Sequence, residues 1–416
     1  MRILIISQYY WPETFAAGIY LRELAEHLVS QGHHITVQTA FPHYPEGVVW
    51  ADYRGKLAMS EKRNDITIRR SFIWAVPRAR PLVFRALAPL TFALSAFISS
   101  LFNGRHDVIY VLYPILPLGF AALLLGKIKH CPVVLGVKDL SIEGLLQAGK
   151  LKPGLVLRSL EGLERRLYKQ SSHIQVPTTN QERYLLGWGV PAGKIAMIPD
   201  WVDPAAITPL SKENGFRRKH GLDGKFVVLY SGNMGYSSEL DTVLAAAKRL
   251  AHVVDIVFVL IGDGVKRSDL ERQAGEAQLR NVSFLPFQPR DQFPEVLAAA
   301  DIGLITLNRK FTTVASQGKM YSIMSAERPI FAVMEKEAWG AGWIDEKALG
   351  KRVDPGNDEE LAQAILEWRA RPDDLLAAGA RGRRFLEERF TVQTCGAAFV
   401  ALFEHVHTMA CRKPAP

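Results

Sequence analysis

Short apolar segments alternate with amphipathic segments along this chain, and the whole alternation occurs twice. In the first half, residues 2–6 and 33–39 have the composition of buried strands, and residues 19–32 between them have the spacing of an amphipathic helix. The second half begins the same pattern again at residues 225–232. Apolar strands that alternate with such helices predict parallel sheets covered on both faces. The chain is therefore expected to form two Rossmann-like α/β domains.

The length of 416 residues also favours two domains over one core. Prolines punctuate residues 199–210, which places the predicted boundary there. We expect an N-terminal domain over 1–200, a C-terminal domain over 201–390, and a final helix over 391–416 that packs back on the first domain. Ligands of open parallel sheets bind beyond the carboxyl ends of the strands, so we expect the two domains to face each other across a cleft.

Charge and cysteine content narrow the class of protein. Three cysteines without a CxxC pair argue against a disulfide framework or a structural zinc site and favour a reducing compartment. The formal net charge of +9 favours anionic partners such as a nucleotide, a nucleic acid or a membrane surface. Neither a zinc finger nor an RNP-type aromatic motif occurs in the sequence, so we expect no nucleic-acid partner.

Residues 86–102 are uncharged and follow Arg78, Arg80 and Arg85. The segment is shorter than the roughly 20 apolar residues that span a bilayer. It fits a helix lying in the membrane interface beside basic residues, or a helix buried against a sheet. The N-terminus has a short apolar run that reads as a first strand and not as a secretion signal. The expected location is cytoplasmic, peripheral on the inner face of the cell membrane.

Polar and small residues follow the predicted strands of the first half. Ala17 and Gly18 open the first helix and let backbone N–H groups approach an anion closely. Lys138, Asp139 and Glu143 follow a later strand. In a cleft these three could bind sugar hydroxyls or stabilise a developing cation; otherwise they are ordinary polar loop residues.

The strands of the second half are followed by a further set of candidates. They are Asn233, Gly235, Ser237 and Ser238 after one strand, Gly262 and Asp263 after the next, and Phe287 and Gln288 after a third. The first group could bind phosphate, or its serines could simply cap a helix. The glycine turn is as easily structural as functional, and the third pair could flank a nucleotide base.

Lys319 lies on the first turn of a short predicted helix, where backbone N–H groups already favour anions. Two positive features at one point predict an anion site, and a solvated surface lysine is the alternative. The sequence contains no P-loop, no HExxH, no Ser-His-Asp order and no DxD pair. We therefore expect a site without a metal or a cofactor, in which side chains and helix ends supply the positive charge.

These segments together resemble retaining glycosyltransferases of family 4, which have the GT-B fold, and more narrowly those of colanic-acid and O-antigen biosynthesis. The resemblance is carried by "YYWPETFAAG", "VKDLSIEG", "YSGNMGYSSE", "FVLIGDG" and "GKMYSIMSAERPI", in family order along nearly the whole chain. It implies a nucleotide-sugar donor on the C-terminal domain, an acceptor on the N-terminal domain and retention of configuration without metal. It places Gly18 near the donor diphosphate and Lys319 at the start of the donor-binding helix.

The chain departs from the family pattern at several positions. Many members have two glutamates eight positions apart, where this chain has Val314 and Ser322. Many also have an arginine and a lysine where Asn233 and Ser238 stand here. Ser322 can still hydrogen-bond a ribose hydroxyl, although more weakly than a carboxylate. Glu327 stands where a glycine usually ends the helix.

Three functions are compatible with these observations. The first is a hexosyltransferase that moves a sugar from a nucleotide sugar to a lipid-linked saccharide in surface polysaccharide biosynthesis. The second is a nucleotide-sugar-binding or scaffold subunit without activity. The third is a nucleotide-sugar epimerase, for which Asp139, Glu143 and His43 are the available acid and base groups. The sequence does not predict the donor base, the sugar or the acceptor.

Overall fold

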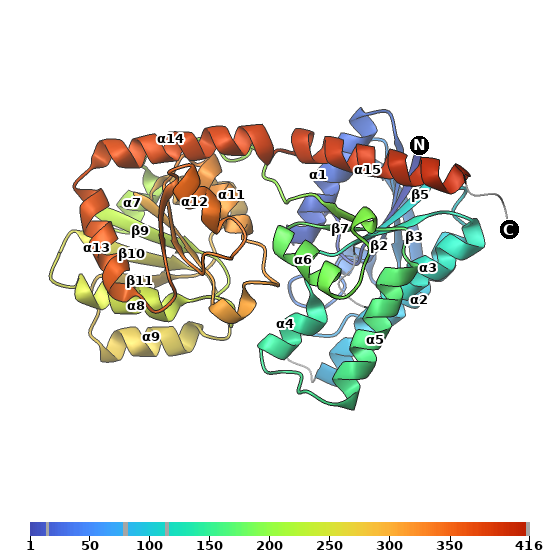
Figure 1. The fold of residues 1–416 in the computed structure, drawn as a ribbon, viewed down its shortest axis with the longest axis horizontal. Helices are drawn as coiled ribbons and strands as arrows, with labels where there is room; N and C mark the ends of the chain where they lie inside the picture. The colour runs from blue at the N-terminus through green and yellow to red at the C-terminus, as the bar shows by residue number, and fades with distance from the viewer. Residues whose placement is uncertain (14–15, 78–81, 113–115, 413–416) are drawn as a thin grey trace. The chain divides into compact units, whose positions relative to one another are not determined.

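The chain folds into two compact α/β domains (Figure 1). The computed structural model describes residues 1–13, 16–77, 82–112 and 116–412. The N-terminal domain consists of Met1–Asp200 together with the segment from Val392 onward, and the C-terminal domain consists of Trp201–Thr391. Both are built on largely parallel sheets, as predicted. Arg78 and Arg80 of the predicted basic flank lie outside the described residues.

One eight-stranded sheet forms the centre of the N-terminal domain, in the order β3-β4-β2-β1-β5-β6-β7-β8. The strands are β1 (Arg2–Ile6), β2 (His34–Ala40), β3 (Ala58–Arg63), β4 (Ile66–Ser71), β5 (Val108–Leu112), β6 (Val133–Gly136), β7 (His173–Val176) and β8 (Ile195–Met197). Neighbouring strands pair in parallel, except that β3 pairs antiparallel with β4 at one edge. All five residues of β5 are buried, as expected for a strand covered on both faces.

The C-terminal domain has a six-stranded sheet that is parallel throughout, in the order β11-β10-β9-β12-β13-β14. Its strands are β9 (Phe226–Ser231), β10 (Ile256–Ile261), β11 (Val282–Leu285), β12 (Ile302–Thr306), β13 (Ile330–Val333) and β14 (Gly350–Val353). The helices are α7 (Gly215–Lys219), α8 (Leu240–Arg249), α9 (Arg267–Glu276), α10 (Phe293–Ala298), α11 (Gly318–Ser325), α12 (Ala341–Glu346), α13 (Asp358–Arg369) and α14 (Pro372–Arg389).

Four strands were not predicted from the sequence: β3, β4, β8 and β14. The sequence of β3, "AMSEKR", is polar and largely exposed, and β14, "GKRV", carries two basic residues. Each of β3, β8 and β14 is an edge strand, held by backbone hydrogen bonds to one neighbour. Such strands lack the continuous apolar run that identifies a central strand in a sequence. The prediction of purely parallel sheets was therefore wrong at one edge, where β3 pairs antiparallel with β4.

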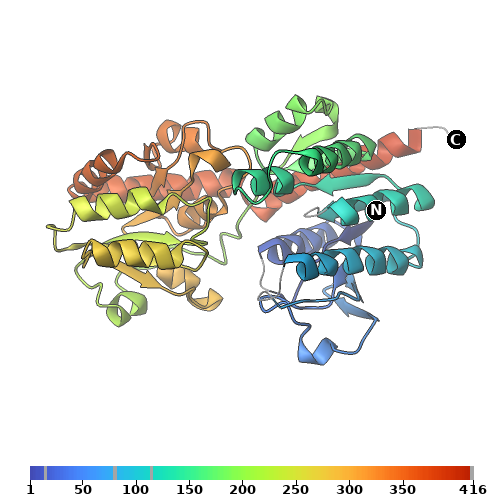
Figure 2. The ribbon, with the colours of Figure 1, turned by 90° about the horizontal axis from the view of Figure 1, so that it is seen from below.

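Helices cover the N-terminal sheet on both faces, as Figures 1 and 2 show. They are α1 (Ala16–Ser30), α2 (Leu82–Leu101), α3 (Leu116–Lys129), α4 (Ser141–Gln147), α5 (Leu155–Gln170), α6 (Thr179–Gly187) and α15 (Val392–Arg412). Helix α1 packs on α15, whereas α2 packs on α3 and α3 on α5. The helices thus form two groups, α1 with α15 and α2 with α3 and α5, on opposite faces of the sheet. Right-handed crossovers explain the two groups, because α1 links strands in the direction opposite to that of α2, α3 and α5.

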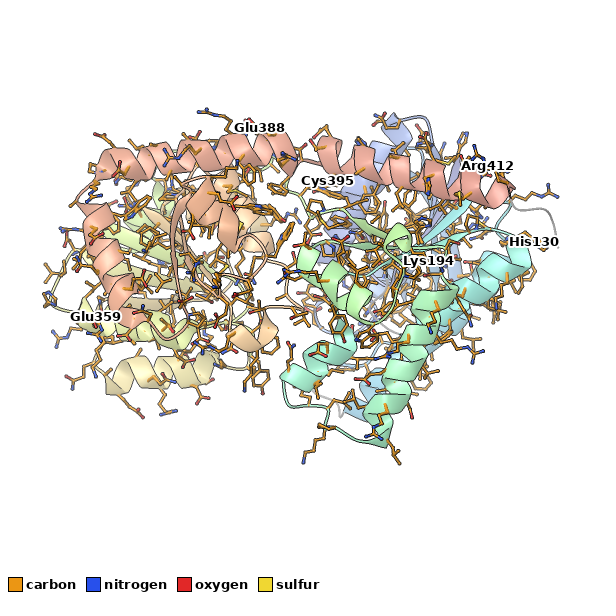
Figure 3. All side chains as sticks on the ribbon, viewed as in Figure 1. His130, Lys194, Glu359, Glu388, Cys395 and Arg412 are labelled. Carbon is orange, nitrogen blue, oxygen red and sulfur yellow. The ribbon has the colours of Figure 1, made fainter. Side chains whose placement is uncertain are left out.

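Helix α15 carries the chain back onto the N-terminal sheet. Figure 3 labels Cys395 in its first turn and Arg412 at its last residue. Phe399 and Phe403 lie within 5.5 and 5.7 Å of the Tyr110 ring of β5, measured between centroids. These aromatic contacts bury one face of the helix and explain why a segment so late in the sequence belongs to the first domain.

A buried ion pair joins the start of β12 to α7 in the C-terminal domain. The Nη2 atom of Arg217 donates to Oδ2 of Asp301 at 2.5 Å, and both side chains are buried. The same Asp301 oxygen accepts the backbone N–H of Val227 at 2.9 Å, which ties the pair to β9. Lys212, which is more than half exposed, also reaches the Asp301 carboxylate at 2.8 Å.

Replacing Asp301 with alanine should lower the free energy of unfolding of this domain by about 3–5 kcal/mol, because the substitution removes the buried carboxylate of Arg217 and leaves it only the half-exposed Glu213 at 3.6 Å. Urea denaturation followed by circular dichroism measures the change. The matched control is Lys212→Ala, which removes an exposed partner of the same carboxylate and should cost no more than about 1 kcal/mol. Equal effects of the two substitutions would contradict the assignment.

Candidate functional site

The carboxyl ends of three neighbouring strands bring the predicted C-terminal residues to one edge of the sheet. Ser231 at the end of β9 is paired with Ile261 at the end of β10, and Ile261 is paired with Leu285 at the end of β11. The loops that follow these strands therefore start side by side. They contain the groups beginning at Asn233, Gly262 and Phe287, which lie far apart in the sequence.

The first two of these loops are bound to each other through their backbones. The N–H of Met234 donates to the carbonyl of Asp263 at 2.8 Å, and the N–H of Lys266 donates to the carbonyl of Met234 at 3.0 Å. A Cβ atom on Gly264, which has a φ of 150°, would lie 2.8 Å from Oδ1 of Asn233. The glycines of this turn thus have a structural purpose, because they let two loops approach at backbone distance. Gly262, Asp263 and Asn233 are brought together by that approach.

Lys319 reaches the same edge from the first turn of α11. Its Nζ donates to the Tyr230 hydroxyl at 2.7 Å and lies 4.1 Å from the centre of the Tyr230 ring. The Tyr230 hydroxyl in turn donates to the carbonyl of Asn233 at 2.7 Å. Gly232 has a φ of 157°, and a Cβ atom there would lie 2.2 Å from Cε and 2.8 Å from Nζ of the lysine, so a larger residue would displace the amine. The lysine is therefore positioned by the β9 strand end and its loop.

The electrostatic state of Lys319 is unusual for a lysine. Burial lowers its pKa to about 7, and burial is the sole cause of the shift. Burial likewise raises the pKa of Tyr230, which keeps the hydroxyl neutral as a partner. Among the residues that the structure describes, Lys319 forms no ion pair with a carboxylate within 4.0 Å. A cationic group held without a counter-ion is the arrangement expected where an anionic ligand binds.

A cavity of about 140 Å³ adjoins Lys319 inside this domain. Ser322, one turn further along α11, also lines it, together with apolar residues of β9, β12 and α10. Val314, which stands at one of the glutamate positions of the family pattern, is buried. The side chain of Ser322 is thus available for a polar contact, whereas Val314 offers none.

Glu327, which stands where a glycine usually ends the helix, adopts the left-handed backbone conformation of that glycine, with a φ of 56°.

The serines before α8 do not cap that helix. Glu239 occupies the N-cap position and its side chain makes no capping bond. Ser238 is buried and donates its hydroxyl to the carbonyl of Gly235 at 2.7 Å, while the carbonyl of Ser237 accepts the N–H of Asn308 at 2.8 Å. The alternative of simple N-capping by serine is therefore wrong. Ser238 holds the shape of its own loop, and the Ser237 carbonyl ties that loop to the segment after β12.

Phe287 and Gln288, which follow β11, differ in how open their side chains are to a ligand. Phe287 is 56% exposed, so its ring is free to take a planar partner. Gln288 directs its amide to its own loop and donates to the carbonyl of Pro286 at 2.8 Å.

The N-terminal candidates lie at the corresponding edge of their own sheet. Gly18 is buried on the first turn of α1, and a Cβ atom there would lie 3.3 Å from the Tyr10 Cα, with Ala17 beside it. Lys138 follows β6, forms an ion pair with Asp200, and lies 3.2 Å from the centre of the Tyr20 ring. Its charge is therefore already partnered within this domain.

The two carboxylates of the same loop differ in their surroundings. Asp139 is exposed. Glu143 lies on α4 and accepts from Nε2 of Gln147 at 2.8 Å and from the Tyr184 hydroxyl at 3.4 Å. The structure thus leaves Asp139 open to a ligand and holds Glu143 against its own helix and α6.

One carboxylate of the N-terminal domain was missed by the sequence reasoning. Glu13 is buried, and its Oε1 accepts the backbone N–H groups of His43 and Tyr44, both at 2.8 Å. Burial raises its pKa, against the opposing influence of His43. Its Oε2 is buried and has no hydrogen-bond partner among the residues that the structure describes. The signal in the sequence is a single carboxylate within the aromatic loop "SQYYWPETF".

His43, the histidine named for an epimerase, is also buried. Its Nδ1 lies 2.9 Å from the carbonyl of Phe41 and its Nε2 lies 3.2 Å from Nε2 of Gln8. Its ring stacks on Tyr9 at 5.1 Å between centroids. Both ring nitrogens therefore have partners inside the domain. Within the described residues, no group of three or more His, Cys, Asp or Glu side chains is arranged to hold a metal ion.

Comparison with known proteins assigns both domains. Residues 16–201 match the family described as "Glycosyl transferase 4-like domain", and residues 225–370 match the family described as "Glycosyl transferases group 1". The two matches together cover most of the chain. The chain is a GT-B glycosyltransferase. The resemblance drawn from its motifs is thereby confirmed.

Relatives of this glycosyltransferase include WcaI of Escherichia coli K12, described as a colanic acid biosynthesis glycosyl transferase. It is 29% identical over 335 residues, which span 78% of this chain and 81% of WcaI. Among solved structures, sucrose-phosphate synthase of Thermosynechococcus elongatus superposes with a TM-score of 0.74 at 17% identity, covering 98% of this chain and 99% of that one. Anabaena HepE in complex with UDP-glucose gives 0.70 at 17% identity, covering 97% and 100%.

The reactivity of Lys319 should reveal its lowered pKa. Because only the neutral amine reacts with acetic anhydride, the labelling rate of Lys319 should rise with a midpoint near pH 7. Peptide mass spectrometry at a series of pH values measures the rate, and the exposed Lys310 serves as an internal reference. A midpoint near the ordinary lysine value of about 10.4 would contradict the burial that the structure assigns to this amine.

Proposed function

We propose that this glycosyltransferase moves a hexosyl group from a nucleotide-diphosphate sugar to a lipid-linked saccharide, with retention of configuration and without a metal. The reaction would serve surface polysaccharide biosynthesis at the inner face of the cell membrane. The single observation that carries the proposal is Lys319, whose amine is held at a helix start without a carboxylate partner among the described residues. The likeness to WcaI supports the pathway, and the likeness to HepE bound to UDP-glucose supports the class of donor.

The donor would bind at the edge built by β9, β10 and α11. Its diphosphate would lie against Lys319 and the first N–H groups of α11, where the helix dipole favours negative charge. The hydroxyl of Ser322 would meet a sugar or ribose hydroxyl, and the exposed Phe287 ring would face the base. The backbone of the Asn233–Gly235 loop is held by Ser238 and by the glycine turn of β10, so it is shaped before a ligand arrives.

Catalysis would follow from charge that develops on the leaving diphosphate. As the bond between the anomeric carbon and the phosphate oxygen breaks, the sugar acquires oxocarbenium character and the diphosphate gathers negative charge. A preorganised cation at that position stabilises the transition state more than the ground state. The neutral fraction of Lys319 in the free protein would become protonated beside the phosphate, because an adjacent anion raises the pKa of a lysine.

The residues of the N-terminal domain would serve the acceptor. Asp139 is exposed and offers a carboxylate to a sugar hydroxyl. Gly18 is the exception, because it lets backbone N–H groups of α1 approach an anion and so fits the donor diphosphate, near which the family resemblance places it. Lys138, ion-paired with Asp200, would orient this loop and not contact the donor directly. Glu143 would have the same supporting role through Tyr184.

A nucleotide-sugar-binding subunit without activity is the second candidate. The observation that favours it is the buried, apolar Val314 at a position where many family members have a glutamate. Such a subunit would bind the donor but neither transfer nor hydrolyse the sugar. An epimerase is less well supported, because both ring nitrogens of His43 already have partners.

Lys319→Ala should weaken binding of the preferred nucleotide sugar by roughly ten- to 150-fold, the equivalent of one charge-assisted hydrogen bond of about 1.5–3 kcal/mol. Isothermal titration calorimetry against UDP-, GDP-, ADP- and CMP-sugars measures the affinity. Lys310→Ala is the matched control, since this lysine is exposed and should leave affinity unchanged.

Transfer itself is tested by incubating the wild-type protein with the nucleotide sugar that binds and with lipid-linked saccharide acceptors, and by determining the anomeric configuration of the product. Binding with no transfer across the acceptors would favour the subunit without activity. Failure of every nucleotide sugar to bind would overturn the proposal.

A further inference from the structure

Helix α2 presents a row of large apolar side chains to solvent. The row consists of Leu87, Leu90, Leu94, Ile98 and, just past the end of the helix, Phe102. Spacings of three and four positions put these side chains on one face of the helix. Leu94 is 62% exposed and Phe102 is 81% exposed, whereas an amphipathic helix normally turns such a stripe toward a core. At about 1.5 Å per residue the row is roughly 22 Å long.

Neighbouring elements extend this apolar surface. Trp74 is 59% exposed, and its backbone N–H donates to Oγ1 of Thr91 on α2 at 3.0 Å. On the adjacent helix α3, Leu124 and Ile128 are exposed one turn apart. The carboxyl ends of α2 and α3 adjoin, because Nζ of Lys129 donates to the carbonyl of Gly104 at 3.1 Å. Figure 3 labels His130 directly after α3.

The charged residues along α2 and α3 and just past their ends are basic. The sequence has neither Asp nor Glu in residues 86–106 or 116–130, whereas Arg105 and Lys127 are exposed beside the ends of the two helices. The nearest carboxylate along the chain, Asp107, is ion-paired with Arg2 at 3.5 Å. An exposed apolar row with basic and tryptophan neighbours is complementary to the interface of an anionic bilayer.

We propose that the α2 row, with Trp74 and the exposed face of α3, docks this glycosyltransferase on the surface of an anionic lipid membrane. Docking would be interfacial, since no helix in the described part of the chain is long and apolar enough to cross a bilayer. The inference deepens the proposed function, because it names the surface that meets the membrane carrying the acceptor. It combines the two alternatives for this segment, since one face of α2 packs on the sheet and the large apolar side chains from Leu87 to Phe102 are exposed within the described part of the chain.

The test is co-sedimentation of the full chain with phosphatidylcholine vesicles that contain phosphatidylglycerol. The double substitution Leu94→Gln with Phe102→Gln should weaken partitioning at least about tenfold, because two large apolar side chains no longer leave water. The matched control is Leu376→Gln, which changes a similarly exposed leucine on α14 of the C-terminal domain and should leave partitioning unchanged. Equal partitioning of the double variant and the wild type would overturn the proposal.

Two further measurements separate the alternatives. Sedimentation velocity without vesicles tests whether a second copy covers the row; a wild-type dimer that the double substitution converts to a monomer would overturn membrane docking. Lys319→Ala should keep vesicle binding and weaken nucleotide-sugar binding roughly ten- to 150-fold. The double variant should weaken vesicle binding and keep the nucleotide-sugar affinity. Failure of docking is thus distinguishable from failure of the proposed donor site.

Discussion

The contact between the Lys319 amine and the Tyr230 hydroxyl is the interaction on which the account of the donor site depends. A lysine side chain is normally solvated or paired with a carboxylate, since burying its charge alone is unfavourable. Here the amine is fixed by an aromatic ring and a neutral hydroxyl, which orient it without neutralising it. Burial lowers the pKa of the amine to about 7, so that much of Lys319 is neutral in the free protein and the cost of burying a charge is smaller. Under the proposed function, the donor diphosphate would supply the missing negative charge.

Close backbone approach gives that contact its geometry. Gly232 leaves room for the lysine, and the turn at Gly262–Gly264 lets the loop after β10 bind the loop after β9 through main-chain hydrogen bonds. These bonds use no side chain, and the Ser238 hydroxyl adds a bond to the carbonyl of Gly235, so the loop is held by its own contacts. Asn233 and Ser238 stand in place of the basic pair of many family members, so under the proposed function Lys319 would be the main cation that meets the diphosphate.

The sequence predicted the positions of the candidate residues well, and their partners poorly. Parallel strands end at a common edge, so the order of strands and loops along the chain was enough to group Asn233, Gly262 and Phe287. The partner of Lys319 could not be predicted in this way, because Tyr230 lies in an apolar strand where its ring reads as core. The pairing of Lys138 with Asp200 likewise depends on a contact between segments 62 positions apart. The edge strands β3 and β14 were missed because main-chain pairing defines them, not apolar side chains.

The central claim is that a diphosphate completes the charge of Lys319, and proton uptake tests it most directly. The measurement is titration calorimetry at pH 7.5 of the nucleotide sugar that binds most tightly, in buffers of different ionisation enthalpy. A lysine with a pKa of about 7 that becomes fully charged on binding should take up roughly three quarters of a proton. This uptake should disappear in Lys319→Ala. Binding without proton uptake, or equal uptake in the variant, would contradict the account.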